Sequence, residues 1–194
     1  MGNLNGKSES SNYENGNLTN GKYSNGKIMD GNHKNGKLAT DTQKDFDIYR
    51  YLGNWNEIAK YKFKWEESCN FASAEYSWDP IRGVMIVKNN CLDAVHRKIY
   101  SRSGVARIPN INDTSKLRIK FNDGLPADPE GDYYVFYTDY DNYSIVGTPS
   151  KDLLWILSRK KKIPVKDVPM LLKKVSSFGF DPEKLISNPA LLTK

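Results

Sequence analysis

The residue types that most often carry out catalysis or hold metals are scarce in this chain of 194 residues. It contains two histidines, His33 and His96, and two cysteines, Cys69 and Cys91. His33 stands in a low-complexity stretch, and the gap of five residues between Cys91 and His96 is not a metal-ligand spacing. No Ser-His-Asp set, paired carboxylates or activated cysteine can be read from the pattern. We therefore expect no catalytic residue, no metal site and no cofactor.

The remaining chemistry open to the two cysteines is a disulfide bond. They bracket two strand-like segments that are joined by a turn at Asp79-Pro80-Ile81-Arg82-Gly83. If residue 78 opposes residue 83, residue 69 lies beside 91 or 92, which is within cross-strand reach. Because the N-terminus lacks a secretory signal, its sequence favours free thiols instead. Both states stay open at this point.

Charge and hydropathy exclude several classes of protein. The net charge of +6 is spread along the chain, whereas a nucleic-acid binder usually concentrates its basic residues on one element. The densest basic run, Arg159-Lys160-Lys161-Lys162, is interpreted as the solvated end of a strand, with a membrane-surface contact as the alternative. No apolar run is long enough for a transmembrane helix. The location is not specified, and we expect it to be intracellular by default.

Residues 1–44 form a tail of low complexity. Asn-Gly recurs at positions 5, 15, 20, 25 and 35, and Asp-Gly occurs at position 30. Asn-Gly favours hairpin turns, but the three residues between successive pairs are too few for strands that bury a face. We predict a disordered tail over 1–44, followed by one domain over 45–194.

The domain shows strand-like segments joined by turn signals, with no helical pattern between them. Alternation is clearest over Phe71–Trp78, where Ala72, Ala74, Tyr76 and Trp78 share one face. The eight predicted strands are Trp55–Phe63, Phe71–Trp78, Val84–Cys91, His96–Ile108, Lys116–Phe121, Tyr133–Thr138, Tyr143–Gly147 and Leu153–Arg159.

Eight short strands with tight connections indicate an antiparallel up-and-down meander, and closure into a β-barrel removes its two exposed edges. After the last strand the period changes to that of a helix, through Val168, Leu171, Val175 and Phe178. Asp167 is placed to cap this helix and Gly179 to end it. The predicted fold is all-β: an eight-stranded barrel with one C-terminal helix packed outside.

Three separated motifs resemble the lipocalin family. They are Gly53-Asn54-Trp55 at the start of the first strand, Thr138-Asp139-Tyr140 at the end of the sixth, and Arg159 at the end of the last. The resemblance covers residues 45 to the C-terminus and is closest to the branch that includes bacterial outer-membrane lipocalins, apolipoprotein D and plant temperature-induced lipocalins. It implies that Trp55 lies at the closed end of the barrel with Arg159 packed over its ring. These motif residues are then structural, and a guanidinium over an indole gains about 0.5–2 kcal/mol.

The inner face of the barrel is expected to form the ligand site. Strand alternation places small residues beside large aromatic ones on this face, which leaves a cavity. Arg102 shares the register of Gly104, but we expect it to point outward into solvent, since one residue of slippage reverses a strand. The side chains predicted to bind ligand are Ala72, Ala74, Tyr76, Met85, Val87, Gly104, Ala106, Leu117, Phe121, Tyr134 and Phe136.

By family analogy, the leading hypothesis is a non-enzymatic protein that binds and carries or buffers a small hydrophobic molecule, of the fatty acid or lysophospholipid class. One alternative is a filled barrel that meets a partner or a membrane surface through the tail or the basic run. A second alternative is a lipid-modifying enzyme.

Overall fold

The computed structural model describes residues 22–24, 27–29, 41–63, 69–121 and 130–193. The chain divides into two units, residues 1–36 and 37–194. Within the first, β1 (Lys22–Ser24) pairs antiparallel with β2 (Lys27–Met29). Most of the tail predicted to be disordered lies outside the described residues, so that interpretation stays a prediction.

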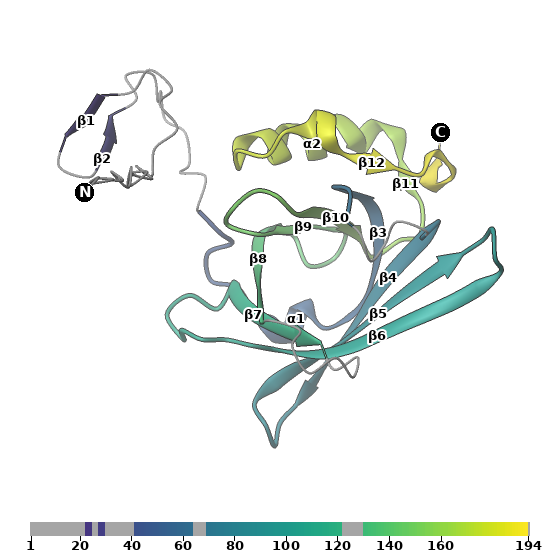
Figure 1. Ribbon diagram of the computed structural model, residues 1–194, viewed down its shortest axis with the longest axis horizontal. Helices are drawn as coiled ribbons and strands as arrows, with labels where there is room; N and C mark the ends of the chain where they lie inside the picture. Colours follow the sequence, from purple (N-terminus) through teal and green to yellow (C-terminus); the bar gives the residue numbers. More distant parts are fainter. Residues whose placement is uncertain (1–21, 25–26, 30–40, 64–68, 122–129, 194) are drawn as a thin grey trace, which may run out of the picture. The chain divides into compact units, whose positions relative to one another are not determined.

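The second unit is a closed barrel of eight antiparallel strands, as the sequence predicted. In order along the sheet, β3 to β10 each pair with their neighbours in sequence, and β10 also pairs with β3, which closes the ring (Figure 1). The strands are β3 (Gly53–Lys60), β4 (Phe71–Asp79), β5 (Val84–Asp93), β6 (Lys98–Arg107), β7 (Lys116–Phe121), β8 (Gly131–Thr138), β9 (Tyr143–Gly147) and β10 (Leu154–Ser158).

The predicted strands all exist, and their ends differ from the predicted ones by up to three residues. β6 begins at Lys98, two residues after the predicted start at His96. Asp93 accepts a hydrogen bond from the His96 backbone N–H, and Arg97 adopts a positive φ of 52°, so this stretch turns instead of pairing. A short helix, α1 (Ile48–Tyr51), precedes the barrel and was not predicted.

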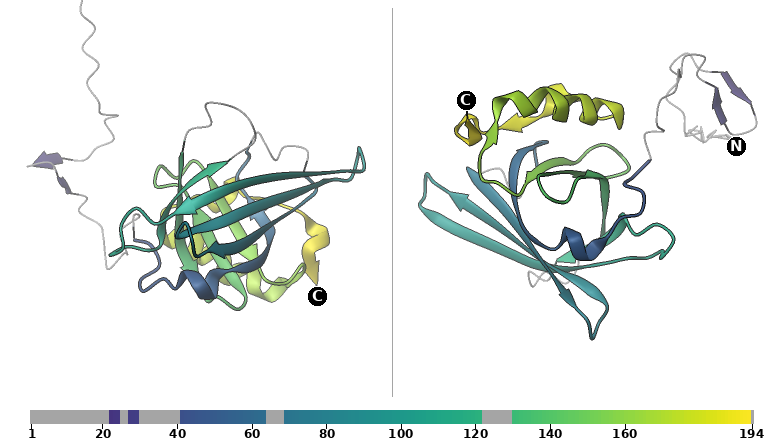
Figure 2. Two further views of the ribbon diagram at one scale, coloured as in Figure 1. Left: turned by 90° about the horizontal axis from the view of Figure 1, so that it is seen from below. Right: turned by 180° about the vertical axis from the view of Figure 1, so that it is seen from behind.

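The C-terminal helix α2 (Val168–Ser177) lies on the outside of the barrel over β8, β9 and β10, as Figure 2 shows from behind. Its buried residues Leu171 and Val175 pack with Phe136 of β8 and Ile145 of β9 in one apolar cluster. Gly179 follows the helix with φ +78°, as expected of a helix-terminating glycine.

Asp167 stands at the N-cap of α2, but its predicted capping role is wrong. Its side chain accepts no hydrogen bond from the helix backbone. Instead, the hydroxyl of Tyr143 donates to Asp167 Oδ2 at 2.6 Å. The carboxylate therefore joins the helix start to the outer face of β9.

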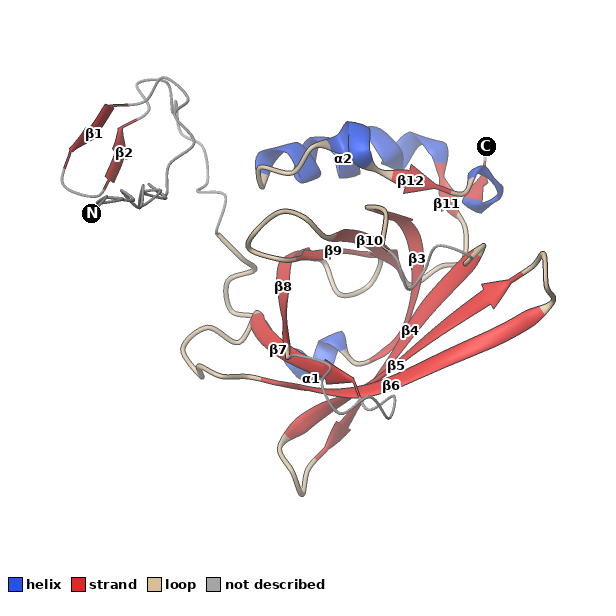
Figure 3. Cartoon of the chain, in the orientation of Figure 1, coloured by secondary structure: helices blue, strands red, loops and turns tan. Residues whose placement is uncertain are grey.

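Short elements complete the unit (Figure 3). β12 (Ile186–Ser187) adds to the edge of β3, and β11 (Ile163–Pro164) pairs in parallel with β13 (Leu192–Thr193). Single turns of 3₁₀ helix span Val165–Asp167, Pro182–Lys184 and Pro189–Leu191.

Cys69 and Cys91 form a disulfide, with their Cα atoms 5.3 Å apart. The predicted pairing of β4 with β5, from which the cross-strand position of the two cysteines was inferred, was wrong by two residues. Asp79 pairs with Val84, and Cys91 consequently lies opposite Ala72 rather than Cys69. The two sulfurs still meet because the chain before β4 continues alongside β5, where the Asn70 N–H donates to the Leu92 carbonyl at 2.9 Å.

Gly104 of β6 marks a very close approach between two strands. A Cβ added at this position would lie 2.4 Å from the Lys120 carbonyl oxygen and 2.9 Å from Phe121 Cα. Both contacts are with backbone, so the neighbouring strand itself would have to move. The glycine is required here for tight pairing of β6 with β7 rather than as an open part of a ligand site.

Gly104→Ala is expected to lower the free energy of unfolding by about 1–3 kcal/mol, through overpacking against β7. Urea denaturation followed by circular dichroism measures the change. Gly131→Ala is the matched control, because a Cβ at Gly131 meets nothing within 4 Å, and we expect it to change stability by less than about 0.5 kcal/mol. Equal effects of the two substitutions would contradict the packing described here.

Candidate ligand-binding site

One end of the barrel is closed by an arginine stacked on a tryptophan. The guanidinium carbon of Arg159 lies 3.8 Å from the centre of the Trp55 ring, and Trp55 is fully buried. This is the contact that the family resemblance implied. Burial lowers the pKa of Arg159 from its ordinary value, although a guanidinium remains charged at neutral pH.

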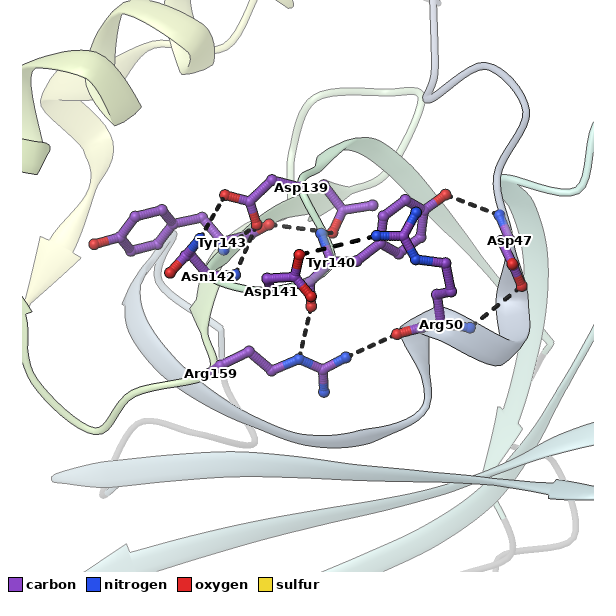
Figure 4. A network of polar contacts seen from close by, with 9 residues as sticks. Asp47, Arg50, Asp139, Tyr140, Asp141, Asn142, Tyr143 and Arg159 are labelled. Carbon is purple, nitrogen blue, oxygen red and sulfur yellow. Dashed lines mark hydrogen bonds and ion pairs between the residues drawn. The ribbon is translucent and has the colours of Figure 1, made fainter.

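Arg159 also links three segments through backbone carbonyls. Nε donates to Tyr140 at 2.9 Å, Nη1 to Asn54 at 3.0 Å and Nη2 to Arg50 at 3.0 Å. Figure 4 shows the side chain between the β8–β9 turn and the N-terminal helix. Since a guanidinium has five donors in a rigid fork, it suits this kind of carbonyl capping better than the flexible ammonium of lysine would.

The Thr138-Asp139-Tyr140 motif forms the β8–β9 turn and presents the Tyr140 carbonyl to Arg159. Asp139 Oδ1 accepts hydrogen bonds from the backbone N–H groups of Asn142 at 2.7 Å and Tyr143 at 2.8 Å. Thr138 Oγ1 accepts from the Tyr140 N–H at 2.9 Å, while Tyr140 itself has a φ of +66°. The side chains of Thr138 and Asp139 thus stabilise the conformation of the β8–β9 turn.

Helix α1 fills the closed end from the N-terminal side. Asp47 Oδ1 caps it, accepting from the Tyr49 and Arg50 N–H groups. The Trp55 indole N–H donates to the Tyr51 carbonyl at 2.9 Å, and the two rings pack with their centres 5.1 Å apart and their planes tilted by 34°. Gly53 connects α1 to β3 with φ +95°, a conformation that favours glycine.

Above this floor the barrel encloses a cavity of about 350 Å³. Its volume is in the range of small-molecule sites, and most of its wall is apolar. The apolar lining comes from all around the barrel: Phe63, Ala72, Ala74, Val87, Ile119, Phe121, Val146, Leu153, Trp155 and Leu157. The barrel is therefore hollow above its floor.

Nine of the eleven predicted inner-face residues fall into three groups. Ala72, Ala74, Tyr76, Val87 and Phe121 line the cavity. Met85, Ala106 and Leu117 are buried in the core around Trp55 and belong to the solid floor. Gly104 makes the strand contact described above.

The prediction that Tyr134 and Phe136 face the cavity is wrong. Phe136 is fully buried on the outer side of β8, where its ring lies 5.7 Å from that of Phe178 and 5.0 Å from that of Phe180. Tyr134 packs against the same cluster under α2. The inner face of β8 instead carries Tyr133, which lines the cavity. Because α2 covers the outer face of β8, both faces of this strand are apolar. The alternation of its residues therefore does not show which face points into the barrel.

Arg102 faces the cavity, which corrects the prediction of an outward side chain. It pairs with Asn89 on the neighbouring strand, and both line the cavity. Its guanidinium carbon lies 4.1 Å from the centre of the Phe121 ring, a cation–π contact that holds the charge against the wall.

The two acidic residues of the lining have basic partners. Lys60 Nζ lies 3.1 Å from Glu57 Oε1, and Arg118 Nη1 lies 3.1 Å from Asp132 Oδ1. The cavity therefore combines an apolar wall with three charged side chains, Arg102, Glu57 and Asp132.

Hydroxyl groups gather at the base of the cavity, and sequence reasoning missed most of them. Tyr76 and Tyr133 line the cavity, while Tyr51 and Ser144 stand behind them. Burial is the main cause that raises the pKa of Tyr51, to about 12, and that of Tyr133 well above its ordinary value. Tyr51 gave no periodic signal because it belongs to α1, outside every predicted strand.

Two further findings limit the chemistry of the described residues. Across the described ranges, no three His, Cys, Asp or Glu side chains gather closely enough to hold a metal ion. None of the helices in the same ranges is both long and apolar enough to cross a membrane.

Arg159→Met is expected to destabilise the fold by about 2–4 kcal/mol, since it leaves three backbone carbonyls without their charged donor. Urea denaturation measures the loss. Lys160→Met, one residue further along and exposed, is the matched control and should fall within about 0.5 kcal/mol of the wild type. If both variants unfold at the same urea concentration as the wild type, Arg159 does not hold the floor together.

The fold and its motifs agree with comparisons to known proteins. The protein-family model described as lipocalin-like domain matches residues 46–190 of the chain. The chain is 32% identical over 151 residues to temperature-induced lipocalin-1 of Arabidopsis thaliana, covering 75% of this chain and 80% of that protein. It is also 32% identical over 151 residues to apolipoprotein D of Cavia porcellus, covering 74% and 76%.

Among solved structures, insecticyanin of the tobacco hornworm Manduca sexta is similar at a TM-score of 0.63 and 26% identity, covering 78% of this chain and 86% of that one. Together with the Arg159–Trp55 floor and the hollow barrel, these matches identify the family. The chain belongs to the lipocalins, whose members are generally non-enzymatic and typically bind small hydrophobic molecules.

Proposed function

We propose that this protein binds and carries a small lipid with an acidic head group, of the fatty acid or lysophospholipid class, in the barrel cavity. The observation that carries the proposal is the combination of an apolar cavity of about 350 Å³ with a guanidinium in its wall. Burial of acyl methylenes gains about 0.8 kcal/mol each, so affinity accumulates along the chain.

Arg102 supplies the preference for an acid. It lies in the row of side chains formed by Ala74, Asn89 and Arg102, so it meets a ligand that already occupies the barrel. A carboxylate or phosphate there gains charge-assisted hydrogen bonds in surroundings that water screens poorly. The contact with Phe121 limits the rotamers of the arginine and so reduces the entropy lost on binding.

A fluorescent fatty acid titrated into the full chain is expected to show saturable binding at one site. Ala74→Phe, which fills the cavity, should weaken binding at least about tenfold. Glu75→Phe places the same ring on the adjacent, exposed residue of β4 and should leave binding unchanged. Near-UV circular dichroism checks that both variants keep their tertiary packing.

Arg102→Gln separates the acid preference from the carrier role in the same assay. The fluorescent acid should bind about tenfold more weakly, while displacement by 1-dodecanol stays as in the wild type. Arg107→Gln, on the opposite face of β6, is the control. If Arg102→Gln weakens binding of the acid and of the alcohol equally, the role of Arg102 is refuted. If the wild type shows no saturable binding at all, the carrier function itself is refuted.

A second candidate function, contact with an anionic membrane surface, is favoured by the β5–β6 hairpin. This hairpin extends beyond the ring of the barrel (Figure 1). Val95 and Ile99 near its turn are 79% and 73% exposed, beside the basic residues Arg97 and Lys98. Ile99 also lines an outer groove with Lys161 and Lys162, two residues of the basic run. Exposed apolar side chains flanked by cations match an anionic lipid surface.

The full chain is expected to co-sediment with vesicles that contain phosphatidylserine, more than with pure phosphatidylcholine vesicles, and to be released by high salt. Ile99→Asp should weaken this binding by about tenfold or more, through lost insertion and charge repulsion. Ile81→Asp, in the turn at the other end of β5 and 95% exposed, is the control. Equal behaviour of the two variants would exclude the hairpin as the contact.

A further inference from the structure

Strands β3 and β4 pair over only part of their length. Their pairing ends where Asn56 lies opposite Ser73. From there β3 continues to Lys60, and on the other side β4 begins already at Phe71, so both strands extend beyond their last pair. In the described residues, the barrel wall therefore has a stretch in which these two neighbouring strands are not paired with each other.

A bulge in β3 lies where the two strands separate. Leu157 of β10 pairs with Glu57, whereas Ile156 pairs with Ala59, so β3 has one extra residue here. A bulge bends its strand, and this one directly follows the last β3–β4 pair. The edge of β3 that β4 leaves is taken by β12, because Ala59 and Lys60 pair with β10 on one edge and with β12 on the other.

The C-terminal segment bounds the unpaired stretch on its far side. Asn188, which follows β12, donates from Nδ2 to the carbonyl of Asn70, just before β4, at 3.0 Å. The stretch is thus bounded by the Asn56–Ser73 pair at one end and by the Asn188–Asn70 hydrogen bond at the other. We call the wall between these two contacts the lateral opening.

An outer groove of about 370 Å³ lies against the lateral opening. Glu57, Ala72 and Ser73 line both this groove and the barrel cavity. They are the residues at which β3 and β4 part, so the groove and the cavity are neighbours across the unpaired stretch. Ala72 and Ser73 have small side chains, which obstruct passage least. Glu57 Oε1 lies 3.1 Å from Lys60 Nζ, which reduces the repulsion between this carboxylate and an acid.

The groove has the chemistry of a site for an acidic lipid. Its apolar side chains include Phe71, Leu92 and Ile99, which lie opposite one another on the outer face of β4, β5 and β6. They are 40%, 37% and 73% exposed. Lys161 and Lys162 line the same groove, and both are exposed. Apolar surface beside two cations suits an alkyl chain that ends in a carboxylate or phosphate.

We propose that the lateral opening is the entrance of the cavity for acidic lipids, which dock in the outer groove and pass between β3 and β4. This rests on the proposed carrier function and specifies the route of its ligand. The alkyl chain enters first, while Lys161 and Lys162 hold the acid outside. The acid then reaches Arg102, whose row of inward side chains is the next one after that of Ala72. No pair between β3 and β4 has to break, since their pairing ends before the opening.

Ser73→Trp tests the route by placing a large ring at the opening. Association and dissociation of a fluorescent fatty acid are followed with the full chain by stopped-flow fluorescence. An obstacle on the path slows both steps without changing the bound state, so both rate constants should fall about fivefold or more while Kd stays within about twofold. Ser77→Trp, on the same face of β4 and exposed, is the matched control and should exchange ligand like the wild type.

Lys161→Gln combined with Lys162→Gln tests the groove without changing the barrel wall. Two cations beside the entrance attract an acid, so their removal should slow association about threefold or more at low salt and have little effect at high salt. Lys166→Gln combined with Lys173→Gln removes the same charge at and just before α2, where both residues are exposed, and is the control. It should associate nearly as fast as the wild type.

The outcomes separate the two proposals. If Ser73→Trp exchanges the acid at the wild-type rates, or changes Kd through one rate constant alone, the lateral opening is not the entrance and the carrier function stands. Equal association rates of the two double variants at low salt would overturn the docking groove in the same way. If no fatty acid binds the wild type, both proposals are wrong. Near-UV circular dichroism checks the folding of each variant, and should Ser73→Trp fail to fold, the two double variants decide the matter.

Discussion

The contact between the Arg159 guanidinium and the Trp55 indole is the interaction on which the rest of the structure depends. The two residues are 104 positions apart in sequence, and the ring contact of 3.8 Å joins the first and last strands at one end of the barrel. The same guanidinium holds the carbonyls of Tyr140, Asn54 and Arg50. A single side chain thus covers one end of the barrel and binds both the β8–β9 turn and α1.

The floor also determines where Tyr51 lies. With its carbonyl held by Trp55, Tyr51 extends its hydroxyl toward Ser144 and Tyr133. The structural motif and the base of the cavity are therefore continuous, because Tyr51 of α1 contacts Trp55 through its carbonyl and Tyr133, which lines the cavity, through its hydroxyl. Arg102, Tyr76 and Tyr133 are among the polar residues that line the otherwise largely apolar cavity.

Much of this could be predicted from sequence, and the failures have identifiable physical causes. The eight strands and α2 were found because their periods differ and turn residues separate them. The inward face of β4 was identified correctly because its outer face is polar, so that Ala72, Ala74 and Tyr76 stand out. On β8 the rule failed, since α2 buries the outer face and makes Tyr134 and Phe136 indistinguishable from inward residues.

Other errors arose where a shift of one or two residues along a strand changes which residues pair or which way a side chain points. The turn after β4 places Asp79 opposite Val84, and this shift changed the partner expected for Cys91. Arg102 was assigned to solvent because one residue of slippage reverses a strand, but it keeps the register of Gly104, and the Phe121 ring offsets part of the cost of facing inward. Tyr51 had no signal at all, because a four-residue helix has too little periodicity to be recognised.

A double-mutant cycle between Arg159 and Trp55 tests the central claim most directly. The free energy of unfolding is measured for the wild type, Arg159→Met, Trp55→Leu and the double variant. If the stacked pair closes the barrel, the two substitutions are coupled, and the double variant loses less than the sum of the single losses by about 1 kcal/mol or more. Additive losses, equal to within about 0.3 kcal/mol, would show that the two residues act separately and would contradict the account.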